Sequence, residues 1–454
     1  MNTLLNADNH GTPLTIIETK NYAHWLSAQP QPCQTWLMNI DFIGKGLALV
    51  PSEKGALSQA IFVVNDVSDY FACGDLITQL PPGQYLLQAE QENKPAIAFA
   101  WLIGAYTFDR YLKKSKRKLL ASLAVNDQKI VDDAINYAEA TTLVRDLVNT
   151  PAADMMPENL AQSAQELAQR FGGEVKHIIG DELLEQNYPT IHAVGRASIH
   201  TPRLIDLTWG HRQHPKVTLV GKGVCFDSGG LDIKPAAGMR NMKKDMGGSA
   251  HVLGLAQLIM AYNLPLNLRV LIPAVENAVS SNALRPGDVV TTRNGLTVEI
   301  HNTDAEGRLV LGDALAEADT EQPELIIDFA TLTGAMRVAL GTELPGFFST
   351  NDEVAAGITL AGSKINDPVW RMPLYSPYDD LFKSTIADMT NCPSVPFGGA
   401  ITAALYLQKF VGKDTDWLHF DIMAFNIRHL SGRPVGGEAF GIRAVFNYLK
   451  SRYN

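Results

Sequence analysis

Two short segments of this chain gather charged side chains of the types that bind metal ions. The first, residues 221 to 248, reads GKGVCFDSGGLDIKPAAGMRNMKKDMGG, and among its charged side chains are the amines of Lys222 and Lys234 and the carboxylates of Asp227 and Asp245. The second, residues 302 to 308, adds two carboxylates and a guanidinium: Asp304, Glu306 and Arg308. Carboxylates crowded together repel one another, and bound divalent cations offset that repulsion. We therefore predict that the two segments meet and hold a pair of divalent metal ions.

The residue types also indicate the chemistry of such a site. A set of oxygen ligands without Cys or His suits Mg²⁺, Mn²⁺, Co²⁺ or Zn²⁺, and the sequence does not choose among them. Lys222 can bind a metal only as a neutral amine, which requires a lowered pKa. Lys234 can remain charged and polarise a carbonyl, while Arg308 can hold a planar anion by two hydrogen bonds. Two metal ions about 4 Å apart activate a water molecule, so the predicted reaction class is metal-assisted hydrolysis of an amide or ester.

Each segment alone is weak support for this hypothesis. An isolated Asp-x-Glu-x-Arg is usually a solvated loop. The sequence Gly221-Lys222-Gly223 does not end a phosphate-binding GxxxxGK[ST] loop either. The hypothesis depends on both segments directly following predicted strands, because ligands of α/β sheets bind at the carboxyl ends of strands.

The elements that position these segments follow from the apolar pattern. In the N-terminal part we predict strands at residues 47–50, 60–64 and 96–100, separated by turn-rich sequence. Apolar residues at helical spacing predict a helix over 127–148, which Pro151 ends, and a second helix opens at Pro157. We place a domain boundary here, with an N-terminal α/β domain and its connecting helix at 1–146 and a catalytic domain at 147–454.

Beyond residue 147 strands and helices alternate. The predicted strands are 217–220, 269–272, 298–300, 325–329 and 418–423, and the predicted helices are 246–262, 308–318 and 400–411. This alternation predicts an α/β fold, in which a smaller N-terminal α/β domain accompanies a larger catalytic domain with a central mixed, largely parallel sheet flanked by helices.

Composition sets the remaining limits. The chain has 454 residues, 46% of them apolar and 19% charged, which is ordinary for a soluble globular protein. The net charge of -10 argues against a general nucleic-acid or membrane-surface binder. The scattered cysteines (Cys33, Cys73, Cys225 and Cys392) form no CxxC pair, which argues against a disulfide framework or a zinc ribbon. We find neither a secretory signal nor a membrane span and expect a cytoplasmic protein.

The basic run from Lys113 to Lys118 is interpreted as a solvated helix end or loop, with a phosphate or nucleic-acid contact as the alternative.

The same segments resemble the leucyl (cytosol) aminopeptidase family of exopeptidases with two metal ions. VGKGVCFDSGGLDIKP, MKKDMGGSA and the signature NTDAEGRL occur in order, and softer similarity runs from LVNTPAADMMP through ATLTGA and GGAITAALYL to the C-terminus. The resemblance therefore covers about two-thirds of the chain, starting at Leu147.

The resemblance implies a role for each matching residue. The positions of the family's metal ligands are Lys222, Asp227, Asp245, Asp304 and Glu306. Asp227 and Glu306 would bridge the two ions, Lys222 would bind the tighter site, and Asp245 would lie where the substrate's amine meets a metal. Lys234 matches the lysine that stabilises the oxyanion, and Arg308 matches the arginine that holds a bicarbonate general base.

The resemblance also implies a set of partners. The ions would be Zn²⁺ or Mn²⁺, with Co²⁺ or Mg²⁺ as alternatives. The substrates would be peptides with a free N-terminus, because binding of that amine to a metal fixes the scissile carbonyl. The family assembles as a hexamer, so a homohexamer is implied here.

One departure concerns the pocket for the first side chain of the substrate. The family usually reads HLDIAG where this chain reads HFDIMA, which places Met423 at a position of small residues. Met423 is predicted to narrow or reshape the pocket, although plain core packing explains it as well. By resemblance the other pocket residues are Met242, Thr331, Leu332 and Gly334. Asp328, which ends a predicted strand, is interpreted as structural or as a support for the metal ligands.

Three other functions compete with an aminopeptidase. A dipeptidase such as a Cys-Gly hydrolase would share the metal motif and differ in its pocket. A DNA-binding regulator is disfavoured by the net charge and the single basic run. A pure scaffold is disfavoured by the complete motifs.

Overall fold

The computed structural model describes residues 1, 3–113 and 120–454, so residues 114–118 of the predicted basic run lie outside the described residues. The described chain forms two compact units. The first contains residues 1–142 and 428–435, and the second contains residues 143–427 and 436–454. Among the described residues, no helix combines the length and the apolar composition that crossing a membrane takes. All four cysteines are free thiols.

The first unit is built on a six-stranded sheet in the order β1-β6-β5-β2-β4-β3. Only β3 runs antiparallel to its neighbour. The strands are β1 (Leu5–Asn6), β2 (Thr12–Glu18), β3 (Gly46–Pro51), β4 (Leu57–Val64), β5 (Gln84–Gln88) and β6 (Ser122–Ala124). The helices are α1 (Tyr22–Ser27), α2 (Gln31–Asn39), α3 (Leu76–Gln79) and α4 (Lys94–Gly104), with short 3-10 turns at Thr19–Asn21 and Gln91–Asn93. Helix α5 (Gln128–Asn149) begins in this unit, and its residues from Leu143 on belong to the second unit.

Helix α4 corrects one prediction, because residues 96–100 were expected to form a strand. Pro95 lies in the first turn of the helix, where its missing N–H is not needed, and alternate alanines favour helix. All residues from Ala96 to Ile103 are buried, so the helix is apolar on every side and shows no helical periodicity in its sequence. A short apolar run of this kind cannot be distinguished from a buried strand by pattern alone.

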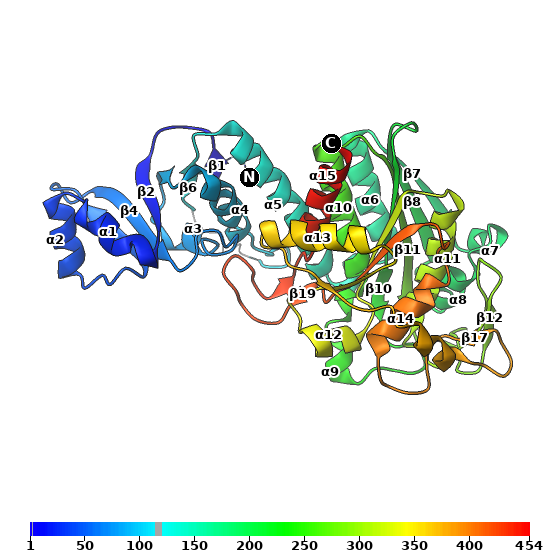
Figure 1. Cartoon of the computed structure of the whole chain (residues 1–454). Coiled ribbons are helices and arrows are strands. Elements are labelled where there is room, and N and C mark those ends of the chain that lie inside the picture. The colour runs from blue at the N-terminus through cyan, green and yellow to red at the C-terminus, as the bar shows by residue number, and fades with distance from the viewer. Residues whose placement is uncertain (2, 114–119) are drawn as a thin grey trace. The chain divides into compact units, whose positions relative to one another are not determined.

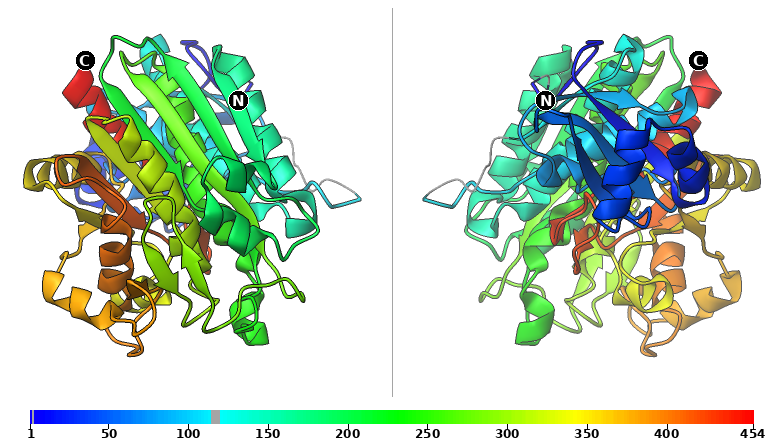
Figure 2. Two further views of the ribbon diagram at one scale, coloured as in Figure 1. Left: turned by 90° about the vertical axis from the view of Figure 1, so that its right-hand side faces the viewer. Right: turned by 90° about the vertical axis from the view of Figure 1, so that its left-hand side faces the viewer.

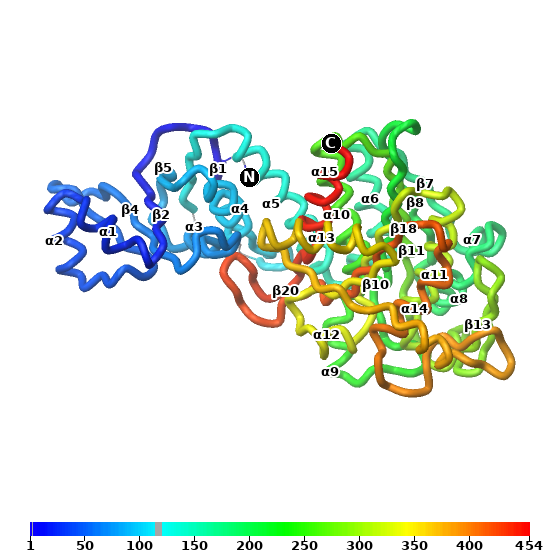
Figure 3. The backbone as a smooth tube through the Cα atoms, in the orientation of Figure 1, coloured from blue at the N-terminus to red at the C-terminus, as the bar shows by residue number. Residues whose placement is uncertain are grey.

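A late segment of the chain also belongs to the first unit. Residues 428–435 form a loop between β19 (Phe425–Asn426) and β20 (Gly436–Gly437) (Figure 3). The Ser431 hydroxyl accepts a hydrogen bond from the backbone N–H of Asp75 at 3.2 Å, and the Asp75 carboxylate accepts one from the N–H of Gly432 at 3.1 Å.

The second unit is organised around a nine-stranded mixed sheet in the order β16-β15-β18-β14-β9-β11-β8-β7, with β10 paired to β11 (Figures 1 and 2). The central strands β18, β14, β9 and β11 are parallel, as predicted from the alternating pattern. The strands are β7 (Glu174–Ile179), β8 (Arg203–Gly210), β9 (Lys216–Gly221), β10 (Gly223–Asp227), β11 (Asn267–Asn277), β14 (Leu325–Ala330), β15 (Gly346–Ser349), β16 (Trp370–Arg371) and β18 (Asp416–Asp421).

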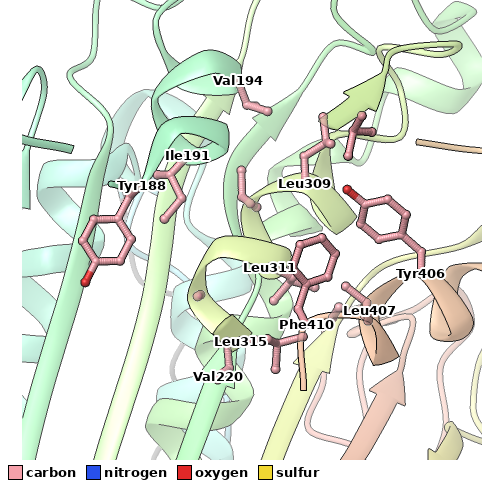
Figure 4. Close-up of a cluster of buried hydrophobic side chains, with 14 of the residues drawn as sticks. Tyr188, Ile191, Val194, Val220, Leu309, Leu311, Leu315, Tyr406, Leu407 and Phe410 are labelled. Atoms are coloured by element: carbon pink, nitrogen blue, oxygen red, sulfur yellow. The ribbon is translucent and has the colours of Figure 1, made fainter. Parts of the chain in front are cut away.

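Helices cover both faces of this sheet. One face packs against α6 (Pro157–Phe171), α10 (Gly247–Ala261) and α15 (Ile442–Tyr453), and the other against α8 (Pro189–Gly195), α11 (Glu306–Thr320) and α14 (Gly399–Gln408). Figure 4 shows the second face, where Ile191, Leu311, Leu315, Tyr406 and Phe410 interlock over the sheet residue Val220. The remaining helices are α7 (Glu182–Glu185), α9 (Ala236–Met239), α12 (Gly334–Leu340) and α13 (Asp352–Lys364), with 3-10 turns at Ala152–Asp154, Met242–Met246 and Ser376–Phe382.

The strand before the second charged segment lies outside the large sheet. The expected strand at 298–300 forms as β13 (Thr297–Glu299), but it pairs with β12 (Val289–Thr291) and β17 (Met389–Thr390) in a separate three-stranded sheet. The prediction that both segments follow strands is therefore confirmed, although the second of these strands lies outside the central sheet. Its short length and the turn at Gly295 explain why β13 closes a local hairpin with β12 instead.

Candidate metal centre

The first charged segment starts at the end of β9 and the second at the start of α11. Lys222 follows β9 directly, and Asp227 is the last residue of β10. Asp245 lies in the 3-10 turn Met242–Met246, and Glu306 is the first residue of α11. Oxygen atoms of Asp227, Asp245 and Glu306 all lie within 4.8 Å of one another, and each residue is only 2% exposed.

Glycines allow the two segments to approach so closely. A Cβ atom on Gly307, next to Glu306, would lie 2.6 Å from Cε of Lys222. A Cβ atom on Gly248 would lie 2.1 Å from the backbone oxygen of Phe329 and 2.9 Å from the Lys222 nitrogen. Any larger residue at these positions would push Lys222 away from the carboxylates.

Lys222 lies between two of the three carboxylates. Its Nζ is 2.7 Å from Oδ2 of Asp245 and 2.9 Å from Oε1 of Glu306. Burial lowers the pKa of this amine, but the carboxylates of Asp245, Glu306 and Asp227 outweigh burial and raise it. The amine is therefore an ammonium ion as long as no other cation neutralises these carboxylates.

Lys234 binds the opposite side of the cluster. Its Nζ lies 2.7 Å from Oδ2 of Asp227 and forms a very short contact with Oδ1 of Asp304. Asp304, whose side chain is 32% exposed, is the outermost carboxylate and joins the cluster through Lys234. Burial lowers the pKa of Lys234, and the Asp227 charge more than compensates and raises it.

The carboxylates remain short of positive charge and of hydrogen-bond donors. Burial, reinforced by the Asp227 charge, raises the pKa of Glu306 to about 8. Oε2 of Glu306 is buried and has no hydrogen-bond partner, and Oδ2 of Asp245 has only the ion pair with Lys222. An all-oxygen donor set with unpaired buried oxygens fits divalent cations, which supply the missing charge.

Hydrogen bonds hold the carboxylates in place. Oδ1 of Asp227 accepts bonds from the side-chain amide of Asn277 and the backbone N–H of Gly229, both at 2.8 Å. The Thr331 hydroxyl lies 2.9 Å from Oδ1 of Asp245. Asn277 was missed from the sequence, although it ends β11 and pairs in register with Asp227 at the end of the parallel strand β10.

Arg308 occupies the third position of α11, two residues after Glu306. Its Nη1 donates to the backbone oxygen of Asn391 at 2.9 Å, and its guanidinium lies 5.9 Å from the ring centre of Tyr406. Its Nε is buried without a hydrogen-bond partner, and burial lowers the pKa of the side chain. A buried N–H with no acceptor fits an anion such as bicarbonate.

The expected pocket residues come from three places in the chain. Met242 opens the 3-10 turn that carries Asp245, and Thr331, Leu332 and Gly334 lie between β14 and the first turn of α12. Half-buried Met423 follows β18. Gly247 directly follows the turn that carries Met242, and it lies close to the other two segments. A Cβ atom added to Gly247 would lie 2.4 Å from Cβ of Ala424, the residue after Met423, and 3.0 Å from Cγ2 of Thr331.

Asp328 contacts none of the predicted metal ligands directly. Its carboxylate accepts hydrogen bonds from Nε1 of Trp417 at 2.8 Å and from Nδ1 of His419 at 2.6 Å. All three residues are completely buried.

Comparison with known proteins places this geometry in a family. Residues 142–446 match the protein-family model of the cytosol aminopeptidase catalytic domain. Residues 12–125 match the protein-family model of the M17 aminopeptidase N-terminal domain. A probable cytosol aminopeptidase of Syntrophotalea carbinolica is 39% identical over 393 residues, which are 83% of this chain and 78% of the relative.

Solved structures agree with these matches. The crystal structure of a cytosol aminopeptidase from Coxiella burnetii is 47% identical and has a TM-score of 0.95, covering 99% of both chains. The bottromycin maturation enzyme BotP in complex with Mn is 31% identical with a TM-score of 0.88, covering 98% of this chain and all (100%) of that enzyme. The chain therefore belongs to the cytosol aminopeptidase family and is a metal-dependent aminopeptidase.

Proposed function

We propose that this aminopeptidase binds two divalent metal ions through Lys222, Asp227, Asp245, Asp304 and Glu306. The observation that carries the proposal is the group of three buried carboxylates whose oxygens lie within 4.8 Å of one another. Oε2 of Glu306 has no hydrogen-bond partner, and Oδ2 of Asp245 has only the ion pair with Lys222. Asp227 and Glu306 would bridge the ions, and Lys222 would bind the tighter site as a neutral amine. Binding would then release the Lys222 proton, so metal affinity rises with pH.

The ions supply Lewis acidity, which lowers the pKa of water and stabilises negative charge on the reacting carbonyl. The chain's own residues orient the substrate. Asp245 would lie where the free α-amine of the peptide would meet a metal ion, and this anchoring would fix the scissile carbonyl against the cluster. Lys234 would remain charged and stabilise the oxyanion. Arg308 would hold bicarbonate as the general base, which its free Nε supports.

Several finer assignments belong to the same proposal. Zn²⁺ or Mn²⁺ is proposed as the metal, with Co²⁺ or Mg²⁺ as alternatives; the Mn complex of BotP supports manganese. The N-terminal domain is proposed to be residues 1–146, and the catalytic domain is proposed to be residues 147–454. Peptides with a free N-terminus would be the substrates, and the assembly would be a homohexamer. A cytoplasmic location is supported by relatives called cytosol aminopeptidases.

The first side chain of the substrate would enter a pocket lined by Met242, Thr331, Leu332, Gly334 and Met423. Met423 leaves less room than the small residue usual at its position, so the pocket is proposed to be narrower than one selective for leucine. Comparison of dipeptides with aminoacyl amides of the same first residue separates a broad aminopeptidase from a dipeptidase, since only the latter requires a free carboxylate on the second residue.

The test is hydrolysis of aminoacyl amides and dipeptides by metal-stripped enzyme with Mn²⁺, Zn²⁺, Co²⁺ or no metal added. We expect release of free N-terminal residues that requires metal, is absent with N-acetylated peptides and is lost in Glu306→Ala. Bicarbonate should raise the rate of the wild type and have little effect on Arg308→Ala. Turnover of N-acetylated substrates, or full activity without metal, would contradict the proposal.

A further inference from the structure

One buried carboxylate accepts hydrogen bonds from the loop of residues 331–334 and holds it in place. Asp421, the last residue of β18, is 1% exposed. Its Oδ1 accepts hydrogen bonds from the backbone N–H groups of Leu332 and Thr333, each at 3.1 Å, and its Oδ2 accepts one from the Thr333 hydroxyl at 2.5 Å. Three donors on a single buried carboxylate leave this loop one conformation.

The same loop reaches a proposed metal ligand. The hydroxyl of Thr331, which is 3% exposed, lies 2.9 Å from both the backbone oxygen and Oδ1 of Asp245. The other oxygen of Asp245 faces Lys222, whose Nζ also lies 3.4 Å from the Thr331 backbone oxygen. Thr331 therefore determines which Asp245 oxygen points toward the cluster.

We propose that Asp421 is a positioning residue of the metal centre, which orients the Asp245 carboxylate through the loop and Thr331. This inference rests on the proposed function, because that proposal makes Asp245 a metal ligand. Groups that orient a ligand without touching the metal typically change metal affinity by about 10- to 100-fold when they are removed.

Asp367 supplies a matched control in the same unit. It is also buried, at 7% exposure, and its carboxylate accepts hydrogen bonds from the backbone N–H groups of Gly441, Arg443 and Ala444, all at 3.0 Å. These bonds fix the start of α15, and none of the partners is a predicted site residue. Loss of either carboxylate should weaken the fold, but only loss of Asp421 should change the metal centre.

The experiment titrates metal-stripped, full-length protein with Mn²⁺ by calorimetry and measures urea unfolding of the same samples without metal. The variants are Asp421→Asn, Thr331→Val, the double variant, Thr331→Ser and Asp367→Asn. We expect Asp421→Asn and Thr331→Val each to weaken Mn²⁺ binding by about 10- to 100-fold. The double variant should bind no more weakly than the weaker single variant, because both changes break one path. Thr331→Ser should restore binding, and Asp367→Asn should lose stability with wild-type affinity.

Three results would overturn the inference. They are wild-type Mn²⁺ affinity in Asp421→Asn, effects that multiply in the double variant, and equal weakening by Asp367→Asn. A wild-type protein that binds none of Mn²⁺, Zn²⁺, Co²⁺ and Mg²⁺ would instead overturn the proposed function, so the two failures are distinguishable.

Discussion

Two of the places where the second unit buries charge are completed differently. In the pair of Arg145 and Glu438, each carboxylate oxygen has a donor: Nε of Arg145 lies 3.1 Å from Oε1, and Nη2 lies 2.9 Å from Oε2. The same carboxylate also accepts from Asn426 at 3.0 Å and from the Ala439 N–H at 2.9 Å. In the metal centre, Oε2 of Glu306 has no partner.

The difference separates structural from functional buried charge. In a buried ion pair that only supports the fold, every polar atom should have a hydrogen-bond partner, which we call a closed pair. An unpaired buried polar atom would destabilise the fold and serve no function. A binding site must leave ligand atoms unpaired until the ligand arrives. The unpartnered Oε2 of Glu306, rather than the number of acidic residues, distinguishes the metal centre from the closed pair.

The largest expected effect concerns the metal centre, where a buried carboxylate oxygen has no partner. Glu306→Ala removes a proposed bridging ligand, and kcat should fall by at least about 10²- to 10³-fold, the range for loss of one charge-stabilising group. Urea unfolding should show that the variant remains folded, because the removed carboxyl group has a buried Oε2 without a hydrogen-bond partner in the metal-free protein. A variant that keeps most of its activity would show that the cluster is not the catalytic centre.

Loss of the Arg145–Glu438 pair should reduce the stability of the protein instead of its metal binding. Glu438→Ala removes the carboxylate that accepts two hydrogen bonds from the buried Arg145 guanidinium, and the free energy of unfolding should fall by about 3–5 kcal/mol. The protein that remains folded should bind Mn²⁺ with wild-type affinity in calorimetry. Weaker metal binding with unchanged stability would reverse the assignment of the two places.

A smaller effect concerns the pH dependence of the metal-free protein. The folded-state pKa of Glu306 is about 8, whereas a carboxyl of this type in an unfolded chain has a pKa of about 4.3. Between these values the folded state holds a proton that the unfolded chain has lost, so this group's contribution to stability falls as the pH rises.

Glu306→Gln keeps the size of the side chain and cannot titrate. The unfolding free energy of the wild type should therefore fall relative to Glu306→Gln from about pH 5 to about pH 8. Urea denaturation of metal-stripped samples measures this difference. Parallel pH curves for the two proteins would rule out a raised pKa for Glu306.

The smallest effect sharpens the comparison at the pocket. Met423→Ala should widen the pocket, so that kcat/KM for leucyl substrates rises relative to alanyl substrates by roughly tenfold, the scale of one methylene in a hydrophobic pocket. Met260→Ala, in buried α10, serves as the control, since it also leaves a cavity but lies outside the predicted pocket. An unchanged ratio in Met423→Ala would make Met423 a packing residue.

The sequence predicts those features that depend on local pattern. The helix at 127–148 forms as α5 because its apolar residues recur at helical spacing over many turns. The parallel strands β9, β11 and β14 form as expected from their β-branched runs. The run at 96–100 was predicted wrongly, since complete burial removes the period that separates helix from strand.

The site divides in the same way. Residue types and spacing indicated the carboxylates and lysines, and the structure brings Asp227, Asp245 and Glu306 together. The supports of these carboxylates could not be found from composition. Asn277 and Asp421 are single polar residues at strand ends, and they reach the site only through the strand register that the fold sets.

The most direct test of the central claim is the metal content of the folded protein. Metal-stripped wild type, Glu306→Ala and Glu438→Gln would be equilibrated with excess Mn²⁺, freed of unbound metal and analysed for manganese per chain. We predict two ions per wild-type chain, fewer in Glu306→Ala, and two in the folded fraction of Glu438→Gln. Equal manganese in wild type and Glu306→Ala, or none in the wild type, would contradict a metal centre built on the open carboxylates.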